Sequence, residues 1–283
     1  MLADTWFLTG ASSGLGRALC EGLLERGCRV AATARDPAAL EATAPARPHA
    51  WWVGRLDVTD EGQIRSAVDA AFAAFGRVDV IVSNAGYGLF GAAEELTDEQ
   101  INQQIQTNLV GPIRLARAVL PYLRAQGGGR IVQISSSAGQ VALPNMSLYH
   151  ASKWGVEGFF DSLAAEVAAF GIGVTIVEPG SVATDFAGRS LVMPPAHAAY
   201  AGSPAAAVRR AIEDGTVRQP GDVRRMAEAI IASVEREPAP RRLALGSDAY
   251  VAMRKALRDR LSALEAQQDL ARSTDRGPQS QGH

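Results

Sequence analysis

Lysine, cysteine and long apolar runs are all scarce in this chain of 283 residues. Its 28 basic side chains include only two lysines, Lys153 and Lys255, and arginine supplies the rest. The two cysteines, Cys20 and Cys28, have neither metal-ligand nor redox-motif spacing, so we expect core thiols and no metal site. No apolar run reaches membrane-spanning length, which argues against a membrane-spanning protein.

A strong charge of one sign is also lacking. The net charge is -2 and acidic and basic residues are interspersed, so there is no broad basic face for nucleic acid and no polybasic patch for a membrane. The start of the chain, Met1 to Asp4, lacks the charged-then-apolar layout of a signal peptide. We therefore expect a cytoplasmic protein whose partners are small molecules.

What is present is an alternation of short β-rich runs with longer alanine- and leucine-rich stretches of helical period. With 47% hydrophobic residues the chain can bury a large core. The alternation predicts an α/β fold, a doubly wound parallel sheet with helices on both faces, in a single domain over residues 1–271. Seven strands are predicted, at residues 5–9, 29–33, 50–55, 78–83, 129–135, 173–178 and 242–245.

The pattern weakens over residues 186–220, where prolines and a glycine break any long element. We interpret this segment as a mobile insertion that forms a lid over a substrate site. An arginine-rich amphipathic helix is expected over residues 248–271. The polar residues 272–283 have the composition of a disordered tail.

The first strand runs directly into Thr-Gly-Ala-Ser-Ser-Gly-Leu-Gly and then into a helix. Glycines let the backbone turn sharply and approach a pyrophosphate, and the helix N-terminus adds unpaired N–H groups and a positive dipole end. This context predicts a dinucleotide site. Its residues are Gly10, Ser12, Ser13, Gly14, Leu15 and Gly16.

The same run also satisfies G-x-S-x-G, which would make Ser12 the nucleophile of a serine hydrolase. A hydrolase of that type needs an earlier strand whose loop donates half of the oxyanion hole, and no strand precedes this one. It also needs a late histidine, and His197 and His283 lie in the lid and the tail. The hydrolase stays a remote alternative.

One of the two lysines lies four residues after a tyrosine, in the run from Tyr149 to Lys153. Positions i and i+4 of a helix share a face, so the phenol and the ammonium would point into the same space. Unlike arginine, lysine carries a compact ammonium that can lie beside another donor and tune its pKa. The spacing alone leaves an ordinary surface helix open as an alternative.

Together these motifs resemble those of the short-chain dehydrogenase/reductase family, in the branch with T-G-x-x-x-G-x-G and Y-x-x-x-K. The resemblance spans residues 5–190 and implies a Rossmann-type fold and a nicotinamide-dependent oxidoreductase. The intervening motifs occur in the expected order: Asp57-Val58, Asn84-Ala85-Gly86, Asn108, Ser136 and Pro179-Gly180.

The resemblance implies a catalytic set of Asn108, Ser136, Tyr149 and Lys153. Ser136 is chosen from three consecutive serines because it lies thirteen residues before Tyr149, the family spacing. Tyr149 would be the general acid in reduction and the general base in oxidation, its pKa lowered by the ammonium and an oxidised nicotinamide. Ser136 would donate to the substrate oxygen, Lys153 would hold the nicotinamide ribose, and Asn108 would keep a water in the proton relay. His150 lies about 100° around the helix and is interpreted as structural.

Cofactor choice depends on the end of the second strand. Where an NAD enzyme of this kind would carry an acidic residue the chain has Ala34, and Arg35 follows, which suits the 2′-phosphate of NADP. NADP(H) is therefore predicted. Asp36 could pair with Arg35, contact a ribose, or cap the next helix. The other cofactor-side residues that the resemblance implies are Asp57, Val58, Asn84, Ala85, Gly86, Pro179, Gly180, Val182 and Thr184, together with Tyr149 and Lys153.

The candidate substrate residues are mostly apolar, which suggests a hydrophobic or aromatic ketone, aldehyde or alcohol. Core or lid packing would explain them equally well. A nicotinamide-binding sensor or scaffold without catalysis could use the same fold. The long helices expected around residues 108–124 and 149–170 resemble those that form homodimers and homotetramers in the family. The substrate candidates are Tyr87, Val141, Leu143, Phe186, Val192 and Met193, beside Ser136 and Tyr149.

Overall fold

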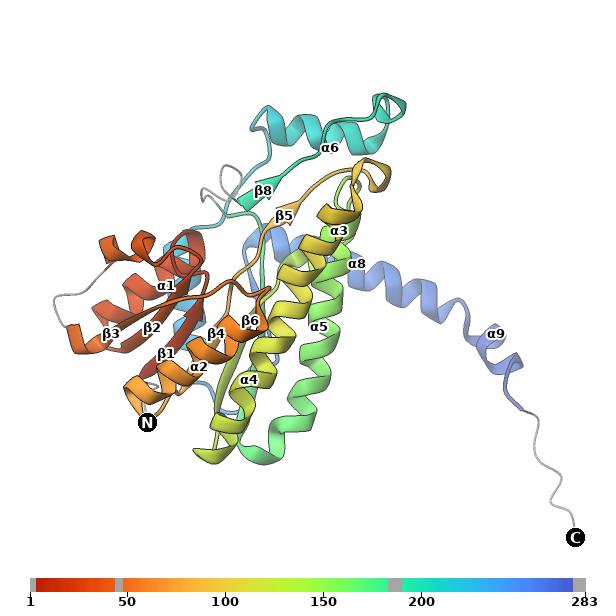
Figure 1. Ribbon diagram of the computed structural model, residues 1–283. Helices are drawn as coiled ribbons and strands as arrows, with labels where there is room; N and C mark the ends of the chain where they lie inside the picture. Colours follow the sequence, from red (N-terminus) through yellow and green to blue (C-terminus); the bar gives the residue numbers. More distant parts are fainter. Residues whose placement is uncertain (1–3, 44–47, 183–189, 277–283) are drawn as a thin grey trace, which may run out of the picture.

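The computed structural model describes residues 4–43, 48–182 and 190–276. Its core is a seven-stranded parallel sheet in the order β3-β2-β1-β4-β6-β7-β9, with helices on both faces (Figure 1). The predicted fold class is confirmed, and every predicted strand is present, two with the predicted bounds and five with ends shifted by one or two residues. The strands are β1 (Thr5–Thr9), β2 (Arg29–Ala34), β3 (Trp51–Arg55), β4 (Val80–Ser83), β6 (Gly129–Ile134), β7 (Ile172–Pro179) and β9 (Arg242–Leu245).

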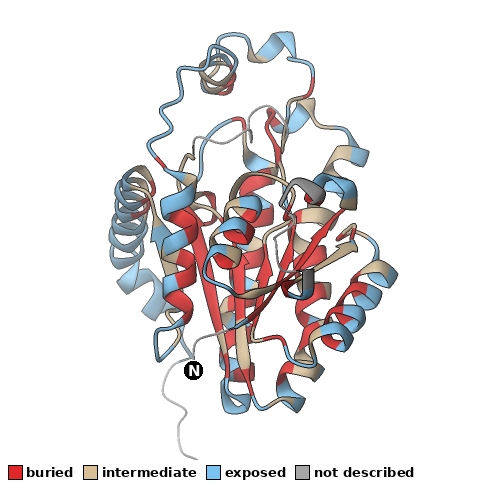
Figure 2. Cartoon of the chain, turned by 90° about the vertical axis from the view of Figure 1, so that its left-hand side faces the viewer, coloured by how far each residue is buried: buried red, intermediate tan, exposed pale blue. Residues whose placement is uncertain are grey.

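Alternate residues of each central strand pack against different helix layers. In β1, the Phe7 side chain packs into the apolar core between the sheet and a layer of three helices on one face. The side chains of Trp6 and Leu8 pack into the core between the sheet and a layer of two helices on the other face. Strands buried on both faces are apolar along their whole length, which is how these runs look in the sequence. Figure 2 shows the buried residues gathered along the sheet and the helix surfaces that face it. The first layer is α2 (Glu61–Phe75), α4 (Gly111–Ala125) and α5 (Ser147–Val167), and the second is α1 (Gly14–Glu25) and α7 (Val223–Val234).

The chain winds outward from the centre of the sheet in two directions. β1 leads to β2 and β3 on one side, and β4 leads to β6, β7 and β9 on the other. The order reverses between β1 and β4, and open α/β sheets bind ligands beyond the carboxyl ends of the strands at such a point. Because Thr9 ends β1 and Ser83 ends β4, the glycine turn and the Asn84 segment meet there.

The described part of the lid contains regular elements that the sequence pattern did not predict. β8 (Leu191–Val192) pairs in parallel with β5 (Gly88–Leu89), forming a small second sheet. A ten-residue helix, α6 (Pro204–Glu213), follows and lies at one end of the molecule (Figure 1). Pro204 was expected to break the chain, but proline is favoured in the first turn of a helix, and here Ser203 caps it.

The described part of the chain ends in two helices rather than one. α8 (Ser247–Glu265) and α9 (Gln268–Ser273) replace the single helix predicted over residues 248–271, and they extend away from the body of the molecule (Figure 1). Most of the predicted tail lies outside the described residues. None of the helices in the described ranges is long and apolar enough to cross a bilayer.

Neither Cys20 nor Cys28 forms a disulfide bond. Cys20 is buried in α1, and burial raises the pKa of its thiol to about 12. Cys28 lies directly before β2, and burial also raises the pKa of its thiol. Raised pKa values disfavour the reactive thiolate. The prediction of a core thiol is confirmed for Cys20, whereas Cys28 is only partly buried against the core.

Candidate active site

The glycine turn has backbone geometry that glycine favours. Gly10 and Gly14 have φ values of 65° and 51°. A Cβ atom on Gly16 would lie 2.2 Å from the carbonyl oxygen of Gly10. Ser13 precedes α1 but makes no side-chain capping hydrogen bond, so the first N–H groups of the helix stay available for a ligand. A close backbone approach beside a free helix N-terminus fits the pyrophosphate of a dinucleotide.

Asn84 joins this turn to the strand beside it. Its side-chain amide donates to the carbonyl oxygens of Thr9 and Gly10, both at 3.0 Å. The backbone N–H groups of Asn84 and Ala85 donate to Thr9 Oγ1 at 3.0 and 3.1 Å. The Asn-Ala-Gly segment therefore holds the glycine turn in place and borders the predicted cofactor site.

Asn108 ties three elements of the site together. α3 (Asp98–Ile105) passes through a π-helical turn (Gln106–Val110) into α4, and Asn108 is buried in that turn. Its Oδ1 accepts a hydrogen bond from Tyr87 N at 3.1 Å, and its Nδ2 donates to Tyr87 O at 2.8 Å and to Ser152 Oγ at 3.4 Å. Turns of this kind occur frequently at functional sites, and the sequence pattern did not predict it.

Tyr149 and Lys153 lie in α5 as predicted, and each is only 8% exposed. Lys153 Nζ donates to Ile134 O at 3.2 Å and lies 5.8 Å from the centroid of the Tyr149 ring. The same ring packs edge-on against Phe90, with the centroids 5.3 Å apart. The alternative of an ordinary surface helix is therefore wrong, because both side chains face the interior.

Burial dominates the charge states of this pair. It raises the pKa of Tyr149 to about 12, opposed by a hydrogen bond with Ser136. It lowers the pKa of Lys153 to about 8, opposed by the charge of Glu157. The lowered tyrosine pKa expected from the sequence is absent in the protein alone, because burial outweighs the hydrogen bond with Ser136.

The three serines after β6 have different surroundings. Ser135 is buried and its hydroxyl donates to Glu157 Oε1 at 2.6 Å. Ser136 is half-buried, begins the 3₁₀ turn Ser137–Gly139 and accepts a hydrogen bond from Ala138 N at 3.1 Å. Since Ser136 also bonds to Tyr149, the geometry favours it over Ser135 as the substrate-facing hydroxyl.

The histidines give no support to a hydrolase. The two ring nitrogens of His150 are bonded to Ala138 O at 2.8 Å and to Leu143 N at 2.9 Å, as expected for a structural residue. Within the described ranges no histidine bonds to Ser12.

A charged cluster that joins α5 to β7 and β9 was not predicted; its two glutamates are buried, whereas Arg242 and Asp161 are partly exposed. Glu157, one turn after Lys153, accepts from Arg242 at 2.6 Å, and Arg242 donates also to Glu178 at 2.5 Å. Arg242 pairs with Asp161 as well. Burial, together with the charge of Glu157, raises the pKa of Glu178. Glu157 could have been predicted to lie near Lys153, because it follows one helical turn later. Its pairing with Arg242 could not, because no sequence signal links two residues that lie 85 positions apart.

The end of β2 carries an unpaired cation. Arg35 is exposed and makes no hydrogen bond or ion pair with any described residue. Asp36 accepts from Ala38 N at 3.1 Å, so it caps the 3₁₀ helix Pro37–Thr43 and does not pair with Arg35. Since Ala34 is buried, the guanidinium is the group offered to a ligand at this strand end.

The other predicted cofactor residues lie at the same edge of the sheet. Asp57 accepts from Thr59 N and Oγ1 at 2.9 and 2.7 Å, whereas Asp60 caps α2. Pro179 ends β7, and Val182 forms a bridge with Gly221. Val58 is buried. Thr184 lies outside the described residues.

Two of the predicted glycines lie close to other side chains. A Cβ atom on Gly86 would lie 3.2 Å from Asn108 Oδ1, and a Cβ atom on Gly180 would lie 2.3 Å from Asp248 Oδ1.

The substrate candidates are less uniform. Met193 packs against the cluster of Phe90, Ala138 and Tyr149. Leu143 and Val192 are exposed, at 51% and 44%, while Val141 and Tyr87 are half-buried. Phe186 lies outside the described residues. Met193 is thus the apolar candidate placed beside Tyr149.

The sheet, the glycine turn and the tyrosine-lysine pair are typical of dinucleotide-dependent oxidoreductases. A family model described as short chain dehydrogenase matches residues 4–192. Oxidoreductase BOA17 of Botryotinia fuckeliana is 39% identical over 253 residues, which are 88% of this chain and 90% of that protein. The chain belongs to the short-chain dehydrogenase/reductase family.

Solved structures agree with this assignment. A short-chain dehydrogenase from Streptomyces avermitilis is 38% identical and superposes with a TM-score of 0.89, covering 96% of this chain and 100% of that one. A short-chain dehydrogenase from Burkholderia cenocepacia in complex with NADP is 26% identical, with a TM-score of 0.72 over 94% of this chain and 98% of that one.

Proposed function

We propose that this oxidoreductase uses NADP(H) to interconvert a ketone or aldehyde with the corresponding alcohol. The observation that carries the proposal is the grouping of Ser136, Tyr149 and Lys153 at the carboxyl end of β6, at the same edge of the sheet as the glycine turn. A binding module would have no need for a buried phenol beside an ammonium. The NADP complex of the Burkholderia relative supports the choice of cofactor.

The bound nicotinamide supplies the hydride in reduction and accepts it in oxidation. Tyr149 moves the proton: its hydroxyl donates to the substrate oxygen in reduction and takes the proton back in oxidation. Ser136 donates a hydrogen bond to the same oxygen as charge develops there. Lys153 holds the nicotinamide ribose and places a positive charge beside the phenol. Asn108 fixes the helices that carry these groups and is the candidate to hold a relay water.

The surroundings of Tyr149 favour an apolar substrate. Its ring belongs to a cluster with Phe90 and Ala138, and partly buried apolar side chains from the start of α5, from residues 191–193 and from α6 pack against it. Apolar walls with a few polar groups are typical of sites for small hydrophobic molecules. The partly buried members are Met146, Leu191, Met193 and Ile212.

The direct test is consumption of NADPH and NADH by the purified protein with aldehydes, aryl ketones and long-chain methyl ketones. We expect turnover of at least one apolar carbonyl class, and faster turnover with NADPH. Tight binding of NADPH without turnover across the whole panel would instead favour a sensor or scaffold.

Arg35→Ala should raise the KM for NADPH by roughly tenfold to a hundredfold, because it removes a charge-assisted hydrogen bond to the 2′-phosphate. The KM for NADH should change little. Arg65→Ala, which removes an exposed arginine on α2, is the matched control. Retention of the full preference for NADPH by the Arg35 variant would contradict the assignment.

The pH dependence of kcat/KM for NADPH should report Lys153, since this constant reflects groups of the free protein. It should fall as the pH rises through about 8, where Lys153 loses its proton, while Tyr149 with a pKa of about 12 stays protonated. Glu157→Gln removes a charge that raises the lysine pKa, so the fall should move to lower pH. Glu166→Gln, on the exposed side of α5, should leave it in place. If kcat/KM of Glu157→Gln falls at the same pH as that of the unmodified protein, Glu157 does not raise the pKa of Lys153.

A further inference from the structure

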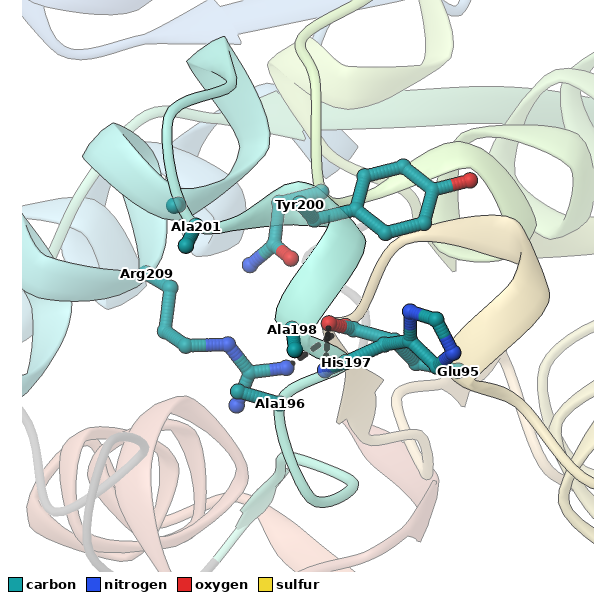
Figure 3. Close-up of a pocket in the computed structure, with 9 residues that line it drawn as sticks. Glu95, Ala196, His197, Ala198, Tyr200, Ala201 and Arg209 are labelled. Atoms are coloured by element: carbon teal, nitrogen blue, oxygen red, sulfur yellow. Dashed lines mark hydrogen bonds and ion pairs between the residues drawn. The ribbon is translucent and has the colours of Figure 1, made fainter.

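A cavity of about 170 Å³ lies between the loop after β5, residues 196–201 and α6 (Figure 3). None of its lining residues belongs to the predicted catalytic, cofactor or substrate sets. Much of its wall is apolar, because four small side chains form it: Ala196, Ala198, Ala201 and Ala206. Its volume exceeds the roughly 30 Å³ that one water occupies in the liquid.

Asn145 is the unusual residue of this wall. It is only 4% exposed, and neither Nδ2 nor Oδ1 has a hydrogen-bond partner among the described residues. Native proteins rarely leave a buried amide unpaired. Its φ of 66° is the only positive value at a non-glycine position in the described ranges, and such conformations cluster at ligand sites. The unpaired amide at a cavity points to a ligand.

The charged groups at the cavity already satisfy each other. Arg209 donates to Glu95 Oε2 at 2.7 Å and to Pro194 O at 2.9 Å. Glu95 also accepts from the backbone N–H groups of Ala92 and His197, at 2.8 and 2.9 Å, as Figure 3 shows for His197. Burial raises the pKa of Glu95, but the hydrogen bonds from His197, Ala92 and Arg209 outweigh it and hold this pKa below its usual value. Since the pair cancels its own charge, the cavity suits a neutral hydrogen-bonding group better than a carboxylate or an amine.

The cavity adjoins the apolar cluster around Tyr149. Two cavity residues lie close along the chain to residues of that cluster, and a third cluster residue precedes a hydrogen-bond partner of Arg209. Two of these three cluster residues are methionines, whose side chains adapt easily to a ligand. A substrate whose carbonyl lies at Tyr149 would therefore extend toward the cavity. Met146 follows Asn145 directly, and Ile212 lies three positions after Arg209 on α6. Met193 precedes Pro194, whose carbonyl oxygen accepts a hydrogen bond from Arg209.

We propose that Asn145 and this cavity form a subsite for the far end of the substrate, and that this end carries a neutral hydroxyl or carboxamide. The alanines contact the apolar chain that joins it to the reacting carbonyl. Asn145 donates one hydrogen bond to the polar end and accepts one from it. The inference rests on the proposed function and narrows the substrate from an apolar carbonyl compound to one with a distal polar group.

The test uses the full chain, NADPH and a series of methyl ketones of increasing length, each with a plain end and with a terminal hydroxyl. In the unmodified protein we expect kcat/KM to be roughly tenfold higher for the hydroxylated member at one or two neighbouring lengths. Asn145→Gly, which accepts the positive φ but removes the amide, should abolish that ratio. Ala206→Leu should abolish it too by filling the cavity, whereas Ala207→Leu, at the next and exposed position of α6, should keep it.

Equal kcat/KM values for the plain and the hydroxylated ketone at every length would show that Asn145 does not bind the hydroxyl group and would overturn the proposal. So would a ratio that survives both Asn145→Gly and Ala206→Leu. If no ketone is reduced, the proposed function fails, and calorimetric titration of the same pairs decides the subsite separately. Tighter binding of the hydroxylated member to the unmodified protein than to Asn145→Gly supports it, and equal affinities overturn it. Thermal unfolding of each variant verifies that it is folded.

Discussion

Tyr149→Phe should lower kcat for carbonyl reduction by about 10²- to 10⁴-fold, the range that positioned proton transfer contributes. The substitution removes only the hydroxyl. The ring keeps its edge-on packing against Phe90, so we expect NADPH binding and the thermal midpoint to stay near those of the unmodified protein. Steady-state kinetics with the best ketone of the panel, together with NADPH titration by fluorescence, measures both quantities.

The chain offers a matched control for this change. Tyr122 in α4 is a half-buried tyrosine whose ring stacks on Phe72 and whose hydroxyl donates to Asp69 at 2.7 Å. Tyr122→Phe should leave kcat unchanged. Activity in Tyr149→Phe within a few-fold of the unmodified protein would show that another group moves the proton.

Lys153→Arg should lose at least about 10²-fold in kcat/KM although it keeps the positive charge. Lys153 is enclosed, with its ammonium bonded to Ile134 O, and a planar guanidinium on a longer side chain cannot place its charge there. Misplacement of a positioning group by about 1 Å can cost 10²-fold in rate. Kinetics at saturating NADPH and at subsaturating NADPH separate a loss in turnover from a loss in cofactor binding.

The second lysine provides the same substitution in an exposed place. Lys255 lies on α8 and pairs with Asp259 at 2.5 Å. Lys255→Arg should behave as the unmodified protein does. Near-normal activity of Lys153→Arg would mean that any cation serves at this position and that the choice of lysine has no chemical reason.

The layered fold could be predicted because its signals are local. Trp6, Phe7 and Leu8 are consecutive apolar residues of one strand. A strand that is buried on both faces of a sheet requires such an uninterrupted apolar run. α6 could not, because a proline followed by alanines is compatible with both a break and a helix start. The feature that identifies the helix start is the cap from Ser203, whose hydroxyl accepts a hydrogen bond from Ala206 N.

Some features of the candidate active site could also be predicted from the sequence, and others could not. Tyr149 and Lys153 share a helix face, so their spacing carries their geometry. The charge states were not predictable, since the pKa of Tyr149 depends on how completely neighbouring elements exclude water. Asn145 gave no sequence signal either, because its importance arises from the absence of a partner within a folded cavity.

Arg242 belongs to the last strand of the sheet, outside the part of the chain that the family model matches. During synthesis at 5–20 residues per second, the 85 residues that separate it from Glu157 take roughly 4 to 17 seconds to add. Until then Glu157 and Glu178 have no guanidinium to share, so the helix that carries Lys153 cannot reach its final surroundings. The proposed active site is therefore completed late, by a strand that is synthesised long after Tyr149 and Lys153.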